Sequence, residues 1–336
     1  MYIEALKKII SGHDLYEEEA TRVMEKLMSG ELTDAQIGAF MGALAAKGES
    51  FEELAGAARA MRRRAVRVQA PGGPVVDTCG TGGDGKGTFN ISTTSAFVVA
   101  GAGVTVAKHG NRAASSRCGS ADVLEALGIP VTAPPERVEE AIGSVGIGFL
   151  FAPLYHGAMR YAAKARKEVG IRSIFNMLGP LTNPAGAGYQ VLGVWDGKLT
   201  EMFAQALNLL GTKRAMVVHG KDGLDEISVC EPTRISELKD GLVRTYDVSP
   251  EQLLGRRSRI EDLAGGEPAE NAAIVKAVLS GEPGPRADVT VVNAAAALVV
   301  TGKARDFADG VDLARNSIES GAALSKLTSL VEFMKQ

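Results

Sequence analysis

The sequence has few cysteines and no long apolar run, and each scarcity limits what the protein can be. Its three cysteines, Cys79, Cys118 and Cys230, are widely spaced, which excludes a disulfide framework and a cysteine-rich zinc site. The longest apolar stretches, at residues 96–107 and 289–301, are too short or too interrupted to span a bilayer, and the N-terminus does not resemble a signal peptide. We therefore expect a cytoplasmic protein without a membrane partner.

An excess of positive charge is also missing. The 336 residues include 37 Lys and Arg against 40 Asp and Glu, for a net charge of −3. Proteins that bind nucleic acid are usually basic, so we expect no nucleic-acid partner. A chain of this length exceeds the size at which a single core usually stops growing, which predicts two lobes.

The first seventy residues show the spacing of apolar residues that is typical of helices. Asp14 is expected to cap the first long helix. Two capping-box patterns, Thr33 with Gln36 and Ser50 with Glu53, predict the starts of the next two helices. This part of the chain is therefore expected to form an all-helical lobe.

A Pro- and Gly-rich boundary at residues 71–74 separates this lobe from a different pattern. Short β-branched runs then alternate with helical patterns, which predicts an α/β lobe with a mostly parallel central sheet flanked by helices. Residues 227–248 alternate with period two and are expected to form a β-rich excursion from the sheet. The expected strands are at residues 75–78, 104–107, 147–151, 191–195 and 216–219.

A glycine-rich segment at residues 77–93 follows the first expected strand and precedes a helix. Five glycines within eight positions allow the backbone to bring its N–H groups close to a bulky anion, and the helix adds its positive end. The segment fits neither the Walker loop nor the dinucleotide fingerprint. It could be only a flexible turn, but the polar string Asn90, Ser92 and Thr93 favours a phosphate or pyrophosphate site.

A basic segment at residues 108–120 follows the second expected strand and includes Lys108, Arg112 and Arg117. A basic loop can be an ordinary solvated surface. Ligand sites of α/β sheets lie where parallel strands end, so this position favours a loop that closes over an anion. His109 either contacts the substrate or is a structural histidine, and the residues leave both interpretations open.

An acidic segment at residues 222–226 follows the fifth expected strand. Adjacent carboxylates at Asp225 and Glu226 are suitable ligands for Mg²⁺, which takes one or two carboxylates together with phosphate oxygens and water. The alternative is a solvated acidic pair. Arg166, on an expected helix, either binds a substrate carboxylate through its planar fork or is simply solvated.

Together and in this order, the segments resemble the anthranilate phosphoribosyltransferase family over nearly the whole chain. The resemblance implies a small helical lobe, residues 1–70 joined by about 160–184, and a larger α/β lobe, residues 74–159 and 185–336. It also implies a homodimer. The matching motifs are Gly-Thr-Gly-Gly-Asp at residues 80–84, Asn-x-Ser at 90–92, Lys-His-Gly-Asn-Arg at 108–112, a Gly-Ser-Ala-Asp run at 119–128, Phe-Asn-x-Leu-Gly-Pro-Leu-Thr-Asn-Pro at 175–184 and Leu-Asp-Glu at 224–226.

This resemblance implies a magnesium-dependent transfer of the phosphoribosyl group of phosphoribosyl pyrophosphate to the amine of anthranilate, in tryptophan biosynthesis. It implies catalytic roles for Lys108 and Asp84, Mg²⁺ ligands at Ser92, Asp225 and Glu226, and anthranilate contacts at Gly80, Asn111 and Arg166. The residues implied to hold phosphoribosyl pyrophosphate are Gly80, Gly83, Asp84, Thr88, Asn90, Ile91, Ser92, Thr93, Lys108, His109, Gly110, Asn111, Arg112, Ala113, Ala114, Ser115, Ser116 and Ser120.

The sequence departs from the family at Leu154, where Asn or His is frequent, and this affects the expected outer part of the anthranilate pocket. Two alternatives compete with the transferase. A pyrimidine nucleoside phosphorylase of the same fold is disfavoured by the basic loop at residues 108–112 and by the acidic pair. A non-catalytic relative that binds nucleic acid through Arg67 and residues 62–64 is disfavoured by the negative net charge. Because no segment offers a convincing base, we expect a reaction without an obligatory general base.

Overall fold

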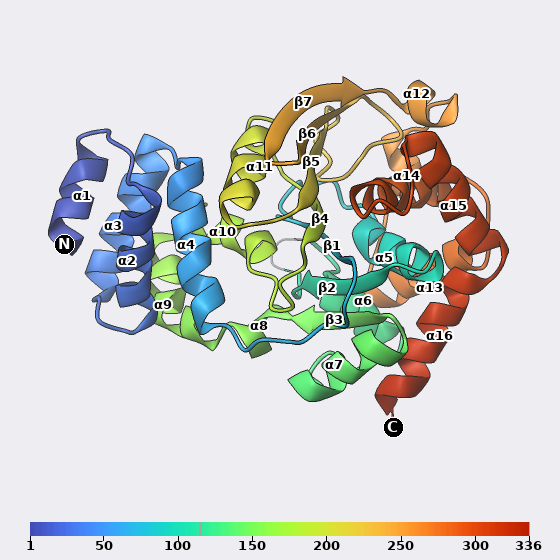
Figure 1. Cartoon of the computed structure of the whole chain (residues 1–336), viewed down its shortest axis with the longest axis horizontal. Coiled ribbons are helices and arrows are strands. Elements are labelled where there is room, and N and C mark those ends of the chain that lie inside the picture. The colour runs from blue at the N-terminus through green and yellow to red at the C-terminus, as the bar shows by residue number, and fades with distance from the viewer. Residues whose placement is uncertain (114–115, 336) are drawn as a thin grey trace.

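The computed structural model describes residues 1–113 and 116–335, so Ala114 and Ser115 of the expected substrate loop lie outside the described residues. The N-terminal helices form a lobe at one end of the molecule, beside a larger lobe built around a sheet (Figure 1). The expected fold class, a helical lobe and an α/β lobe with a mostly parallel sheet, is confirmed. No helix among the described residues has the length and apolar character needed to cross a membrane.

Helices from two separate parts of the chain pack together at this end of the molecule. The capping boxes expected at Thr33 and Ser50 are both present, at the starts of α3 and α4. Helix α9 packs on α2 and α3, although more than 100 residues separate it from them. The helices are α1 (Tyr2–Ile10), α2 (Glu17–Met28), α3 (Asp34–Lys47), α4 (Phe51–Arg64), α9 (Arg160–Val169) and the short α10 (Phe175–Leu178).

The expected cap at Asp14 is wrong. The N-cap of α2 is Tyr16, whose backbone N–H donates to the Glu19 carboxylate at 2.9 Å. Asp14 instead forms an ion pair with Lys47, at the end of α3. A charged partner from another helix has therefore replaced the local capping role that the sequence suggested for Asp14.

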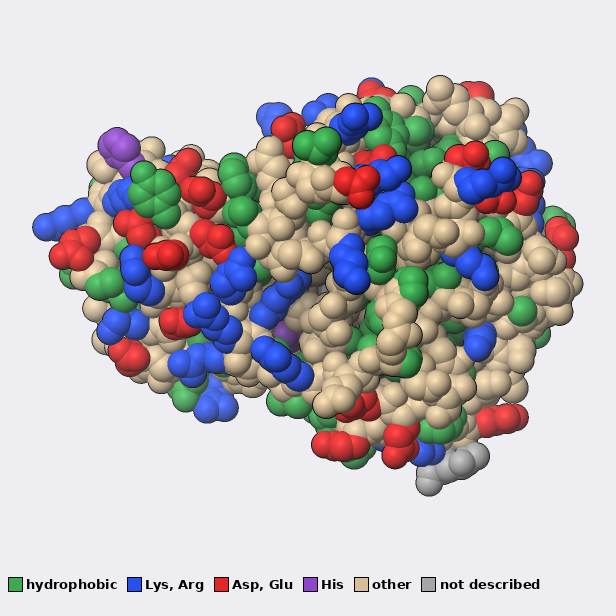
Figure 2. All heavy atoms as spheres, viewed as in Figure 1, with side chains coloured by type: hydrophobic (Ala, Val, Ile, Leu, Met, Phe, Trp, Pro, Cys, Tyr) green, Lys and Arg blue, Asp and Glu red, His purple; other side chains and the backbone are tan. Residues whose placement is uncertain are grey.

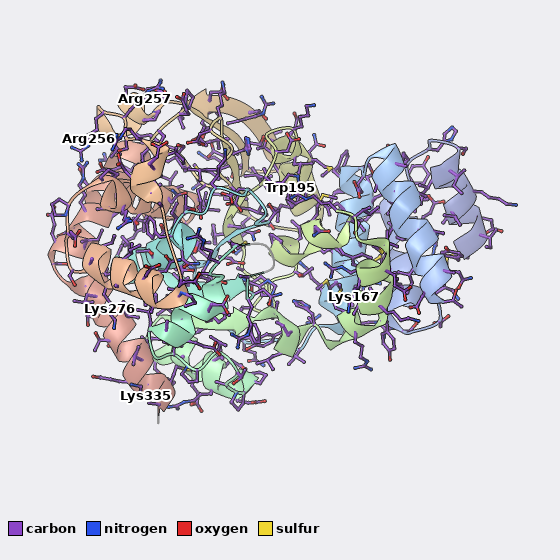
Figure 3. The ribbon with its side chains drawn as sticks, turned by 180° about the vertical axis from the view of Figure 1, so that it is seen from behind. Lys167, Trp195, Arg256, Arg257, Lys276 and Lys335 are labelled. Atoms are coloured by element: carbon purple, nitrogen blue, oxygen red, sulfur yellow. The ribbon has the colours of Figure 1, made fainter. Side chains whose placement is uncertain are left out.

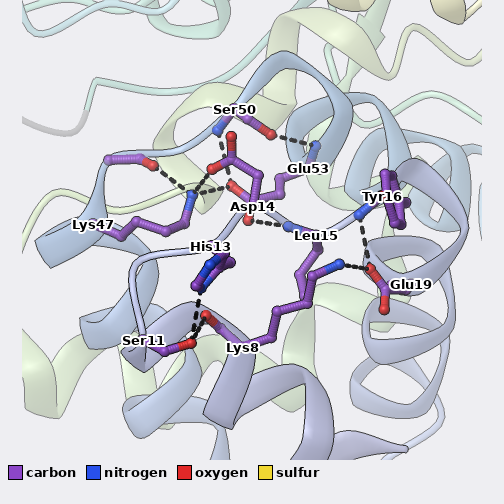
Figure 4. Close-up of polar contacts among 11 residues, drawn as sticks. Lys8, Ser11, His13, Asp14, Leu15, Tyr16, Glu19, Lys47, Ser50 and Glu53 are labelled. Carbon is purple, nitrogen blue, oxygen red and sulfur yellow. Dashed lines mark hydrogen bonds and ion pairs between the residues drawn. The ribbon is translucent and has the colours of Figure 1, made fainter.

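A carboxylate is buried at the centre of this contact (Figure 4). Glu53 Oε1 accepts a hydrogen bond from the Leu15 N–H at 2.9 Å. Glu53 Oε2 accepts one from the Ser50 N–H at 2.9 Å and another from Lys47 Nζ at 3.0 Å. The charge of Glu53 is thus compensated by a cation and by two backbone donors, which is the condition for burying it without a large penalty.

The seven strands form a single sheet in the order β3-β2-β1-β4-β5-β6-β7. Strands β1 to β5 are parallel, and β6 and β7 are antiparallel. The expected excursion at residues 227–248 is therefore corrected, because β6 pairs with β5 along its whole length and extends the main sheet. The strands are β1 (Val75–Gly80), β2 (Thr105–Gly110), β3 (Ile147–Phe151), β4 (Tyr189–Gly193), β5 (Arg214–Gly220), β6 (Thr233–Lys239) and β7 (Leu242–Val248).

Helices cover both faces of the sheet. On one face α5 packs against α14 and α16, and on the other α11 packs against β5, β6 and α4. Successive residues of β4 point to opposite faces: Val191 joins the core around α5, and Leu192 joins the core that continues into the helical lobe. These helices are α5 (Ile91–Gly101), α6 (Ser120–Ala126), α7 (Pro135–Ser144), α8 (Ala152–Tyr155), α11 (Leu199–Leu209), α12 (Pro250–Leu254), α13 (Pro268–Leu279), α14 (Pro285–Val300), α15 (Phe307–Glu319) and α16 (Ala322–Lys335).

The strand order places a ligand site at one edge of the sheet. The chain runs from β1 outward to β2 and β3, and then returns to the other side of β1 as β4. The loops after β1 and β4 therefore diverge at a topological switch point, where open α/β sheets bind ligands outside the carboxyl ends of their strands.

Candidate active site

The glycine-rich loop after β1 meets the acidic loop after β5 at this edge. The Gly82 N–H donates to Asp225 Oδ2 at 2.9 Å, and the Ser92 N–H, at the start of α5, donates to Glu226 Oε1 at 3.1 Å. The Asp84 carboxylate lies close enough to influence the ionisation of Asp225. Two segments that are far apart in the sequence thus form one site, and backbone N–H groups hold its carboxylates.

Gly193, at the end of β4, allows the acidic loop to reach the glycine-rich loop. A Cβ atom at Gly193 would lie 1.5 Å from the carbonyl oxygen of Asp225, a distance that no side chain can occupy. The acidic loop therefore passes directly over the end of β4, and this contact fixes the backbone of Asp225 relative to the sheet.

Lys108 supplies the positive charge beneath these loops. Its side chain is buried on β2, and Nζ donates to the carbonyl oxygen of Thr78 and to Ser92 Oγ at 3.2 Å. Burial lowers the pKa of Lys108, while the nearby carboxylates of Asp77 and Glu226 oppose that shift. Ser92 thereby connects Lys108 to the acidic loop, since its N–H and its hydroxyl face opposite charges.

Two residues that the sequence did not single out hold β2 in place. Asp77 is buried on β1, and its Oδ1 accepts a hydrogen bond from the His109 N–H at 3.0 Å. Asn183 donates to Asp77 Oδ2 and to the Ala107 carbonyl, both at 2.8 Å. An acid inside a mostly apolar strand was the available signal for Asp77. Asn183 lies in the matched motif at residues 175–184, but its partners could be assigned only from the fold.

The acidic residues of the site carry unusual pKa values. Burial, followed by the charge of Asp84, raises the pKa of Asp225 to about 7. Burial, followed by the charge of Asp225, raises the pKa of Glu226 well above its usual value. Like charges held together in a poorly solvated position favour a bound cation.

The donor set is suited to a hard divalent cation. Asp225 and Glu226 offer hard oxygen ligands, and the backbone N–H groups of Gly82 and Ser92 hold them beside the glycine loop. Within residues 1–113 and 116–335, no group of three or more His, Cys, Asp or Glu side chains is arranged to hold a metal ion.

His109 and His156 are buried next to each other, with ring centroids 5.2 Å apart. Burial lowers their pKa values to about 3 and about 4, so both rings are neutral near pH 7. His109 Nδ1 lies 3.1 Å from the carbonyl oxygen of Gly179, which can only accept, and the proton is therefore on Nδ1. Among the described residues, His109 Nε2 and both nitrogens of His156 lack a partner.

The loop after β2 is only partly brought to the site. Asn90 Nδ2 donates to the carbonyl oxygen of Cys118 at 3.2 Å, which ties this loop to the start of α5. Arg112, expected to hold the phosphoribosyl substrate, instead pairs with Asp122 at 3.1 Å and Glu125 at 2.6 Å on α6. Its guanidinium therefore faces α6 in this structure, because α6 carries both acidic residues that neutralise it.

The remaining expected contacts fall into three groups. Ile91 and Thr93 are buried in the first turn of α5, and Thr88 forms an isolated bridge with Ala264. Around the second loop, the Ala113 N–H donates to Asp122, the Ser120 hydroxyl donates to the Asn111 carbonyl, and Ser116 is exposed. Gly80, Gly83 and Gly110 lie at or just after the ends of β1 and β2.

Arg166 comes from the helical lobe. Its guanidinium carbon lies 5.4 Å from the centroid of the Phe175 ring, and burial lowers its pKa. No carboxylate pairs with Arg166 in the part of the chain that the structure describes. Lys and Arg side chains gather on the helical side of the hollow between the lobes, and a histidine is visible inside it (Figure 2).

Comparison with known proteins agrees with this geometry. Residues 3–65 match the helical bundle domain of a glycosyl transferase family, and residues 72–324 match its α/β domain. The anthranilate phosphoribosyltransferase of Syntrophobacter fumaroxidans is 68% identical over 336 residues, which is 100% of both chains. That of Moorella thermoacetica is 54% identical over 98% of this chain and 97% of its own.

Solved structures of similar proteins share the whole fold. The crystal structure of anthranilate phosphoribosyltransferase from Thermus thermophilus matches with a TM-score of 0.93 and 47% identity, over 99% of both chains. The Saccharomyces cerevisiae enzyme in complex with phosphoribosyl pyrophosphate and Mg matches with a TM-score of 0.90 and 28% identity, over 99% of this chain and 98% of that one. The chain belongs to the anthranilate phosphoribosyltransferase family.

Proposed function

We propose that this protein transfers the phosphoribosyl group of phosphoribosyl pyrophosphate to the amine of anthranilate and releases pyrophosphate, a step of tryptophan biosynthesis. The observation that carries the proposal is the meeting of the glycine loop, Lys108 and the Asp225–Glu226 pair at the switch point of the sheet. The glycine loop can bind an anion, Lys108 supplies a cation, and the acidic pair supplies oxygen ligands for a metal. A pyrophosphate leaving group needs all three.

Magnesium is the metal that this site fits. Asp225 and Glu226 would hold it, the Ser92 hydroxyl is assigned as a third ligand, and Asp84 lies next to Asp225. When bound, the ion neutralises charge that develops on the leaving pyrophosphate. Support for magnesium also comes from the Saccharomyces cerevisiae enzyme, whose structure contains phosphoribosyl pyrophosphate and Mg.

The residues of the chain do the rest of the chemistry by charge and orientation. The bond between the anomeric carbon and the pyrophosphate oxygen breaks, and a bond from that carbon to the amine nitrogen forms. Lys108 and the loop N–H groups stabilise the departing negative charge. The aromatic amine attacks as a neutral group and then releases a proton to water. With a pKa of about 3, His109 is a poor proton acceptor, which supports a reaction without an obligatory base.

The phosphoribosyl substrate is assigned to the glycine loop and to the loop after β2. Anthranilate is assigned to Gly80, Asn111 and Arg166, with the Arg166 guanidinium on the carboxylate. Arg166 has no acidic partner among the described residues, and a planar fork matches a carboxylate well. In this assignment Arg112 must leave Asp122 and Glu125 to contact phosphate, or it has only a structural role.

The fluorescence of anthranilate provides the decisive experiment. Wild-type protein with phosphoribosyl pyrophosphate should consume anthranilate only when Mg²⁺ is present. The reaction should slow by about a thousandfold in a variant that carries both Asp225→Asn and Glu226→Gln. Well-folded wild-type protein that leaves anthranilate unchanged would overturn the proposal, and phosphorolysis of pyrimidine nucleosides would be the next activity to assay.

We further propose a cytoplasmic homodimer whose helical lobe comprises residues 1–70 and about 160–184. Three free, buried cysteines suit a reducing compartment. The exposed side chains of Ile3, Ile10 and Tyr16 give the helical lobe an apolar surface that a second copy could cover. Light scattering coupled to size exclusion should give twice the chain mass, and a monomer at micromolar concentration would contradict the dimer.

A further inference from the structure

Arg172 has no role in the site described so far, yet it reaches the glycine loop from the helical lobe. It lies between α9 and α10, where the chain has left the first of these helices and not yet begun the second. Its Nη2 donates to the carbonyl oxygen of Gly83 at 3.2 Å. Arg172 therefore forms a direct hydrogen bond between the helical lobe and the loop to which pyrophosphate binding is assigned.

Trp195 holds the guanidinium in place. The Arg172 guanidinium carbon lies 4.5 Å from the centroid of the Trp195 ring, a distance at which a cation interacts favourably with an indole face. Trp195 follows β4, packs against the core shared with the helical lobe, and lies on the side of the α/β lobe that faces that lobe (Figure 3). The stacking surface thus comes from one lobe and the cation from the other.

Gly83 is suited to this contact in two ways. Its φ of +78° is a conformation that glycine adopts without strain. A Cβ at this position would also lie 3.0 Å from Arg172 Nη2, so the absence of a side chain lets the guanidinium approach. Because the C=O and N–H of a planar trans peptide point in opposite directions, holding the Gly83 carbonyl also orients the N–H of Asp84.

The charge of Arg172 is uncompensated. No carboxylate pairs with it among residues 1–113 and 116–335, whereas Arg112 and Arg59 each have an acidic partner. An unpaired cation on an anion-binding loop adds positive potential where the substrate charge must arrive. Both the hydrogen bond and the charge therefore favour the same ligand group.

We propose that Arg172 is a positioning residue for phosphoribosyl pyrophosphate: stacked on Trp195, it fixes the Gly83 carbonyl and so keeps the glycine loop in the conformation that binds pyrophosphate. This inference rests on the proposed function for its substrate, although it concerns binding rather than turnover. It assigns Trp195 to the same unit as the support for the guanidinium.

Steady-state kinetics of Arg172→Ala test the proposal. We expect the KM for phosphoribosyl pyrophosphate to rise about tenfold, which is typical for loss of a charge-assisted hydrogen bond, while the KM for anthranilate stays within about twofold. Arg172→Lys should be intermediate, because an ammonium can still donate to Gly83 but does not stack as a planar fork does. Equal KM values for phosphoribosyl pyrophosphate in all three proteins would overturn the proposal.

Lys167→Ala is the matched control, because it removes a positive charge from α9 of the same lobe (Figure 3). It should leave both KM values unchanged. If Lys167→Ala and Arg172→Ala raise the KM for phosphoribosyl pyrophosphate equally, the effect is one of general charge, and the positioning role is wrong.

A binding experiment separates this inference from the transferase activity. Trp195 is the only tryptophan of the chain, so its emission reports on the contact directly. Titration of wild-type protein with phosphoribosyl pyrophosphate and Mg²⁺ should change this emission, and calorimetry should show about tenfold weaker binding to Arg172→Ala. If wild-type protein is inactive as a transferase but still gives these binding results, the proposed function is wrong and the role of Arg172 stands. Equal affinities would remove the role of Arg172.

Discussion

The helical lobe and the α/β lobe each contain acidic side chains in poorly solvated positions, and they stabilise them differently. Glu53 receives hydrogen bonds from two backbone N–H groups and from Lys47, all within its own lobe. Asp225 and Glu226 each receive a backbone N–H, but they lie next to one another and to Asp84, and their pKa values are raised. The first arrangement is complete in the protein alone, whereas in the second the neighbouring acids repel one another.

This difference distinguishes a structural charge from a functional one. A buried carboxylate with all its partners maintains a fold, whereas carboxylates that repel each other are found where a ligand is to be recognised. Burial alone does not separate the two cases. The partners of each oxygen do, and substitutions in the two lobes should therefore have opposite consequences.

The largest effect is expected in the α/β lobe. The combined Asp225→Asn and Glu226→Gln variant should lower the transferase rate by about a thousandfold, because the metal ligands are lost. Its melting temperature should stay equal or rise, since the repulsion between the acids is removed. Calorimetry beside the fluorescence assay checks both outcomes. Asp240→Asn, in the exposed turn between β6 and β7, is a control that should change neither.

The opposite result is expected for the helical lobe. Glu53→Ala should lower the free energy of unfolding by about 3 to 4 kcal/mol, because two buried N–H groups lose their acceptor and Lys47 loses one of its two carboxylate partners. The rate per folded molecule should be unchanged. Glu53→Gln, which keeps an acceptor, should cost less. Urea unfolding measures these losses, and a Glu53→Ala variant as stable as wild type would show that the two acidic sites do not differ in this way.

The buried histidines His109 and His156 extend the comparison between the lobes to groups that are neutral at pH 7. Their pKa values of about 3 and about 4 lie below the ordinary value, so protonation favours the unfolded chain. Stability is complete above about pH 6.5 and is lost as the pH falls toward these values. At pH 5 each histidine should cost about 2 kcal/mol relative to pH 7.

Urea unfolding at pH 7 and pH 5 measures this loss. A variant with His109→Gln and His156→Gln should have a flatter dependence on pH than wild type. His13→Gln, at an exposed position of the helical lobe, should leave the dependence unchanged. If the double variant loses as much stability as wild type between the two pH values, other groups account for the acid sensitivity.

The smallest effect concerns a helix cap on the helical lobe. Thr33→Ala should destabilise the protein by about 1 kcal/mol, because the N–H of Gln36 loses the acceptor that the Thr33 side chain provides. Thr33→Ser keeps the oxygen and should be nearly neutral. Thermal unfolding resolves the two. A loss for Thr33→Ala as large as that for Glu53→Ala would show that exposed and buried partners contribute equally, contrary to the comparison.

How well the sequence predicted the structure depended on how local each interaction is. The capping boxes at Thr33 and Ser50 and the loops at the ends of β1 and β2 were predictable, because short patterns specify them. Asp14 was assigned wrongly, because its partner Lys47 lies 33 residues away. The role of Arg172 could not be derived from its neighbours in the chain either. Gly83 and Trp195 come from other segments and meet it only in the folded protein.

The place of the β6–β7 hairpin in the sheet was not predicted, because it also depends on a non-local contact. Alternation in residues 227–248 indicates strands but does not say which strand β6 pairs with. The substrate assignment of Arg112 rested on the motif that contains it, and the acids of α6 that neutralise it are ten and thirteen residues further along. Local chemistry was therefore predicted more reliably than the partner of each charge.

The contact between Gly193 and the carbonyl oxygen of Asp225 restricts how related sequences can diverge. Even alanine, the smallest replacement, would place its Cβ in steric overlap with that oxygen. Descendants that keep the acidic loop in this position must therefore keep glycine at the end of β4, and a change there has to be accompanied by a rebuilt loop. Positions 193 and 225, more than thirty residues apart, must therefore change together, even though only Asp225 carries a functional group.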